Sequence, residues 1–64
     1  MLYQKLMKEI LYAKSCYSVR DQLFQIYGRV TMARELEAIT MDEFLQLNHE
    51  IVYEGINNPV YANR

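Results

Sequence analysis

Residues 36–44, Leu-Glu-Ala-Ile-Thr-Met-Asp-Glu-Phe, have the pattern of one helix ending, a short turn and a second helix beginning. Thr40 and Glu43 have the spacing of a capping box, in which each side chain accepts a hydrogen bond from the other residue's backbone N–H. Asp42 and Glu43 also suit the positive N-terminal end of a helix. We expect Ile39 to point inward from the turn. The stretch predicts a helical hairpin and an all-α fold.

The length of the chain limits how such a hairpin can be stabilised. A chain of 64 residues forms one small domain at most, and domains of this size usually need a disulfide, a metal or association with another chain. Cys16 is the only cysteine and His49 the only histidine, which leaves no intramolecular disulfide and too few ligands for a structural zinc site. We therefore expect no metal and no cofactor, and we expect the domain to be oligomeric or to dock on a larger protein.

The spacing of apolar residues divides the chain into three helices. They cover residues 2–16, 19–37 and 41–54 of a domain at 1–56, which is followed by an irregular tail at 57–64. The second and third helices form an antiparallel hairpin, and the first helix packs across it. Because the first helix is apolar over most of its circumference, we expect it to be central, or to face a second chain as well as its own.

The second helix is predicted from an apolar stripe that runs from Val19 to Leu36. Ser18 and Asp21 match the S-x-x-D pattern of a helix N-cap. Gly28 lies in the middle of the stripe, where glycine costs about 0.5–1 kcal/mol relative to alanine. Either another helix approaches closely there or the helix breaks. The stripe continues across Gly28, which favours one continuous helix.

The end of the third helix is predicted from a glycine. Gly55 is expected just past the last turn in a left-handed conformation, with Ile56 making the hydrophobic contact of a Schellman motif. Residues 58–61 match N-P-x-Y, a motif bound by phosphotyrosine-binding domains in receptor tails beside a membrane. No apolar run in the chain reaches the length needed to span a bilayer, so we interpret these residues as an ordinary Asn-Pro turn.

Tyrosines and charges indicate where a partner would bind. Tyr3, Tyr17 and Tyr27 fall on apolar stripes and are expected in the core, whereas Tyr12 lies on the polar side of the first helix. The first helix carries three lysines against one glutamate, and the third carries four acidic residues with no lysine or arginine. This asymmetry favours contact between the first and third helices. The expected interface combines apolar residues of the first helix with acids of the third: Leu2, Met7, Leu11, Tyr12, Glu43, Glu50 and Glu54.

Catalytic and metal-binding patterns are weak. Cys16 and His49 are the residues best suited to act as nucleophile or base near neutral pH, but a catalytic pair would need both within hydrogen-bond reach and a third group to orient the histidine. Nothing near Cys16 in the sequence stabilises a thiolate. His49-Glu50 lacks the second histidine of H-E-x-x-H, since Tyr53 occupies that position. We expect the chain not to be an enzyme.

Residues 36–47 resemble the short helical hairpins of SHOCT domains. The resemblance is carried by Leu36, Ile39, Thr40, Asp42, Glu43 and Phe44. The sequence departs from that pattern at Ala38, where the family has a glycine, and in lacking the later lysines. The resemblance implies a helical hairpin. In size and style the chain is also similar to small accessory proteins of phages and mobile elements.

These patterns predict a small, cytoplasmic, non-catalytic protein-interaction module that self-associates, or binds a larger protein as an adaptor or inhibitor. The alternative is a small DNA-associated transcriptional regulator that uses Arg20, Arg29 and Arg34 of the second helix. A net charge of −1 gives no general attraction to nucleic acid or to an anionic membrane. We therefore expect the partner to be a protein or a second copy of this chain.

Overall fold

The computed structural model describes residues 1–62, so the last two residues of the expected tail, 63 and 64, lie outside the described part. Three α-helices account for most of it: α1 at Leu2–Ala13, α2 at Val19–Glu35 and α3 at Met41–Asn48. α3 continues directly into a π-helix, η1, at His49–Ile56, and a short 3-10 helix, η2, covers Pro59–Tyr61. The described residues form no strand, which confirms the all-α class.

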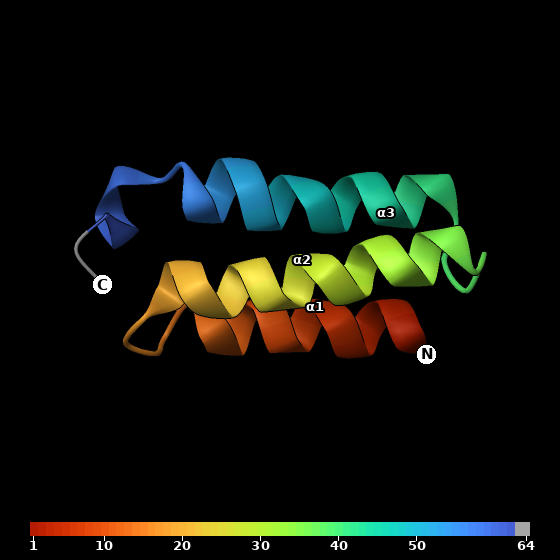
Figure 1. The fold of residues 1–64 in the computed structure, drawn as a ribbon, viewed down its shortest axis with the longest axis horizontal. Coiled ribbons are helices and arrows are strands. Elements are labelled where there is room, and N and C mark those ends of the chain that lie inside the picture. The colour runs from red at the N-terminus through yellow and green to blue at the C-terminus, as the bar shows by residue number, and fades with distance from the viewer. Residues whose placement is uncertain (63–64) are drawn as a thin grey trace.

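The helices form an elongated bundle with extents of 34 × 16 × 15 Å. α2 runs antiparallel to α1 on one side and to α3 on the other (Figure 1). α2 makes the most contacts with the other elements, while α1 also touches α3. The central helix is therefore α2. Of the two expectations for the first helix, the central position is wrong, and contact with a second chain stays a prediction.

The core follows the helical spacing of the sequence. Its buried residues are Leu6, Ile10, Ala13, Val19, Leu23, Ile26, Val30, Ala33, Ile39, Leu47 and Ile51. Leu36 was expected to continue the stripe of α2, but it follows the last turn of that helix and is 71% exposed. Tyr17 and Tyr27 are exposed rather than in the core, and Tyr3 is half-buried.

The turn between α2 and α3 has the predicted chemistry. The Thr40 hydroxyl accepts a hydrogen bond from the Glu43 backbone N–H at 3.1 Å, and the Glu43 carboxylate accepts one from the Thr40 N–H at 2.9 Å. Ile39 is buried, as expected. The Arg34 guanidinium donates to the Ile39 carbonyl at 3.1 Å. These contacts confirm the capping box and tie the start of α3 to the end of α2.

The connection between α1 and α2 differs from the prediction. α1 ends at Ala13 rather than at residue 16, and the Ser15 hydroxyl donates to the Tyr12 carbonyl at 2.7 Å. Tyr17 therefore lies in a loop and not on a helical stripe. Ser18 precedes α2, but its φ of 53° is left-handed and its side chain makes no capping hydrogen bond. The expected side-chain cap is wrong, because a capping residue normally needs an extended backbone.

The two glycines differ from the prediction in where two helices approach closely. α2 passes through Gly28 without a break, which confirms the continuous helix, but a Cβ built there meets no atom within 4 Å. Gly55 is buried inside η1 and has no positive φ, so it is not a Schellman residue. A Cβ on Gly55 would lie 2.5 Å from Leu23 Cδ1 and 3.0 Å from the Glu50 carbonyl oxygen. The close approach of two helices therefore occurs at Gly55.

Part of the expected irregular tail is ordered by a local turn. The Asn58 side-chain oxygen accepts a hydrogen bond from the Val60 N–H at 3.0 Å, at the start of η2. Tyr61 is half-buried and packs against the core. The tyrosine of the N-P-x-Y pattern is therefore part of the fold.

The two glycines predict opposite effects of the same substitution. Gly28→Ala should stabilise the fold by about 0.5–1 kcal/mol, because alanine is the better helix former and meets no neighbour. Gly55→Ala should destabilise it by roughly 1–3 kcal/mol, because its methyl group overlaps Leu23. Urea unfolding followed by circular dichroism measures both, and shifts of the same sign would contradict the placement of Gly55.

The capping residues give a second matched pair. Thr40→Ala should lower the free energy of unfolding by about 1 kcal/mol, because it removes the side-chain acceptor of the capping box. Ser18→Ala should leave it nearly unchanged, because the Ser18 side chain makes no cap. If the two substitutions had equal effects in the same urea titration, the caps would not differ as described.

Candidate functional site

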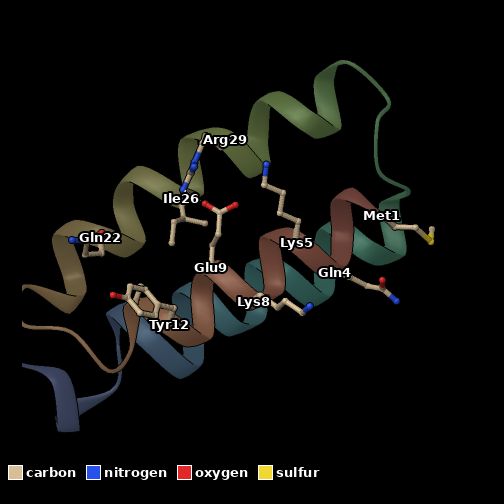
Figure 2. A pocket seen from close by; sticks show the side chains of 10 residues that line it. Met1, Gln4, Lys5, Lys8, Glu9, Tyr12, Gln22, Ile26 and Arg29 are labelled. Atoms are coloured by element: carbon tan, nitrogen blue, oxygen red, sulfur yellow. Dashed lines mark ion pairs between the residues drawn. The ribbon is translucent and has the colours of Figure 1, made fainter.

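A groove between α1 and α2 is a clear concave feature of the described surface. Its main part has a volume of about 470 Å³. Figure 2 shows side chains of both helices around it, with Arg29 extending from α2 toward Glu9 on α1. Its base includes the buried residues Ala13 and Ile26, and Tyr12 lies at one end. The site is therefore an open channel along two helices.

An ion pair crosses the middle of this groove. Arg29 Nη2 lies 2.6 Å from a Glu9 carboxylate oxygen, and the Arg29 side chain is mostly exposed. Exposed pairs of this kind contribute little to stability, typically about 0.2–1 kcal/mol. The pair does neutralise both charges within the groove.

The groove continues past the ion pair into an apolar part of about 270 Å³. This second part shares Lys5, Glu9 and Arg29 with the first, so the two form one surface. Its remaining lining is entirely apolar: Leu2, Leu6, Met32, Ala33, Leu36 and Ala38. We call the combined surface the α1–α2 groove.

The structure separates the apolar residues predicted for the interface into two sets. Leu2 and Tyr12 line the α1–α2 groove, and Tyr12 is 73% exposed. Met7 lines a different groove, formed with Leu45 and His49 of the third helical segment. Leu11, 55% exposed, lies one helical turn after Met7 and so belongs to that second side of α1. α1 therefore presents two apolar edges and not one face.

The acidic residues predicted for the interface do not form one free surface. Glu43 is engaged in the capping box with Thr40. Glu50 accepts a hydrogen bond from Lys14 at 2.8 Å, which confirms the expected contact between the first and third helices. Glu54 lies 3.5 Å from His49 Nε2 and is half-exposed. Glu43 and Glu50 are thus hydrogen-bonded within the chain, and Glu54 lies within ion-pair distance of His49.

Among the groove residues that sequence reasoning missed are two exposed apolar ones, Met32 and Leu36. Leu36 was assigned to the core because it continues the stripe of α2, and Met32 was not singled out. Met32 lies one helical turn before Leu36, and it is 54% exposed. The spacing of Met32 and Leu36 by one helical turn places both on one face of α2. That this face is exposed could be inferred only once the end of α2 at Glu35 was known.

The residues considered for catalysis are engaged in local contacts. The Cys16 thiol lies 3.5 Å from the Tyr12 carbonyl, to which it donates. His49 stacks on Tyr53, with ring centroids 5.5 Å apart. Within residues 1–62, no three His, Cys, Asp or Glu side chains gather as a metal site would require. Cys16 and His49 therefore each contact a neighbouring residue of their own segment and share no hydrogen bond with one another within the described residues.

The arginines considered for DNA binding are each anchored within the chain. Arg20 donates twice to the Ile56 carbonyl, at 3.0 and 2.8 Å, and Arg34 donates to the Ile39 carbonyl. Arg29 pairs with Glu9. A phosphate would have to compete with these contacts for all three side chains.

Comparison of the chain with protein-family models, curated proteins and solved structures gave no significant match. In the part of the chain that the structure describes, no helix combines the length and apolar character of a membrane span.

Proposed function

We propose that this chain is a small, non-catalytic protein-interaction module of the cytoplasm that binds a larger protein as an adaptor or inhibitor. The observation that carries the proposal is the exposed apolar lining of the α1–α2 groove. Soluble proteins rarely leave several large apolar side chains together at the surface without a partner to cover them.

The exposed residues of the groove are free to contact a partner, because the core of the domain is complete without them. Leu23, Val30 and Ile10 are fully buried between the helices. Leu2, Met32 and Leu36 lie outside that core, where burial against a partner would gain apolar area. Tyr12 adds an aromatic ring with a polar tip, a residue type enriched at protein interfaces.

The partner of the interaction module can also be a second copy of this chain. A domain of this size has a small core, and a second copy could cover either apolar edge of α1. Light scattering of the purified chain separates the two forms. A monomer would favour a different protein as partner, and a stable oligomer would favour a second copy.

A matched pair of substitutions tests the function at the groove. Leu36→Gln should weaken capture of the partner from a native-host lysate by about tenfold, because it removes an exposed apolar contact without adding charge. Leu11→Gln, on the other edge of α1, should have little effect. Both residues are more than half exposed, so helicity should be unchanged in each variant.

Nuclease treatment of the same lysate is the second arm of this experiment. Capture that survives nuclease supports a protein partner. Loss of all capture on nuclease treatment would contradict the proposal and favour the DNA-associated alternative. Equal losses for Leu36→Gln and Leu11→Gln would contradict the assignment to the α1–α2 groove.

A further inference from the structure

We infer that the α1–α2 groove binds an amphipathic helix of a partner protein, and that carboxylates flank the apolar face of this helix. The inference rests on the proposed function and adds the chemistry of the partner to it. It follows from the shape, the apolar lining and the charge of the groove.

The shape of the groove fits a helix. The groove runs along α1 and α2, which are adjacent and antiparallel (Figure 1). Its two parts share three lining residues. The buried alanines Ala13 and Ala33 lie at its base, one in each part, and their short side chains permit close approach. Helices pack at interaxial distances of about 8–10 Å by placing side chains into such grooves. A fourth helix would extend the bundle.

The apolar lining provides anchor points at both ends. Leu2, Met32 and Leu36 surround the end near the α2–α3 turn. Tyr12 is the exposed side chain of the part nearer the α1–α2 loop, where Ile26 belongs to the buried base. A partner helix with apolar residues at intervals of three and four would contact both sets along one face.

The charge of the groove determines which side chains should lie beside the apolar face of the partner helix. Glu9 and Arg29 neutralise each other, which leaves Lys5 and Lys8 as the other charged side chains of the lining. Neither lysine forms an ion pair with another residue of the described range. The groove therefore carries a local charge of +2, from two lysines, in a chain whose net charge is −1. Carboxylates beside the apolar face of the partner would complement it.

The same charges disfavour a second copy of this chain as the occupant. In a twofold dimer each copy presents the same patch to the other. Lys5 and Lys8 of both copies would then be brought to one interface, where like charges repel. An acidic partner removes this repulsion.

The test is a selection from a displayed library of amphipathic helical peptides that have a fixed leucine seam and randomised flanking positions. Helices that bind the wild-type chain should be enriched in Asp and Glu at the flanks. Their affinity should fall roughly fivefold in the Lys5→Gln/Lys8→Gln variant, in which two exposed charge pairs are lost. It should also fall between about 0.1 M and 1 M salt, because screening shortens the Debye length from roughly 10 to 3 Å.

A matched control removes the effect of overall charge. Asn57→Glu/Val60→Glu adds two negative charges at exposed positions after η1 that do not line the groove, so both double variants change the net charge from −1 to −3. The control should change affinity by at most about twofold, because these charges are distant and screened.

Three results would overturn the inference: selection of no binding helix, selected helices without acidic flanks, or equal loss of binding in the two double variants. The proposed function is tested separately, because capture of a host protein that depends on Leu36 does not require acidic flanks. If that capture holds while the selection fails, the function stands and the partner chemistry is wrong.

Discussion

The close approach of α2 and η1 at Gly55 is the contact on which the rest of the bundle depends. Leu23, fully buried on α2, occupies the space that a Cβ on Gly55 would take. Gly55 is buried within the π-helix η1, in which the Asn57 N–H donates to the Val52 carbonyl five residues earlier at 2.9 Å. Arg20 then donates to the Ile56 carbonyl, and Arg34 to the Ile39 carbonyl at the other end of the segment. α2 thus holds the third helical segment through the shared core, the Leu23–Gly55 contact and two guanidinium groups.

This arrangement determines which surfaces of α1 are left free. The inner residues of α1, Leu6 and Ile10, are buried in the core. The two flanking edges border α2 on one side and α3 on the other, and each edge lines a groove. Hydrogen bonds from Tyr3 to Gln46 and from Lys14 to Glu50 cross the α3 side. The α2 side is crossed by the Glu9–Arg29 pair and has the larger groove. We therefore place the proposed partner on the α2 side.

The prediction from sequence succeeded where one local interaction dominates. Thr40 and Glu43 cap α3 by contacts within four residues, and the apolar spacing of α2 continues through Gly28. The prediction from sequence failed where tertiary packing determines the local conformation. Gly55 has the composition signal of a helix end, yet packing against Leu23 keeps it inside η1. The groove could be predicted only in part, since Leu2 and Tyr12 were identified while Leu36 was assigned to the core. Whether Leu36 lies in the core or in the groove depends on where α2 ends, and helix propensity locates a helix end only to within a few residues.

Two methionines of similar exposure offer the most direct test of the α1–α2 groove as the partner site. Met32 lines the groove and is 54% exposed, whereas Met41 begins α3 outside the groove and is 50% exposed. Their oxidation by peroxide can be followed by mass spectrometry in the free chain and in its complex with the captured partner. We predict that the partner slows oxidation of Met32 and leaves Met41 unchanged. Oxidation of Met32 at the same rate in both states would contradict the account.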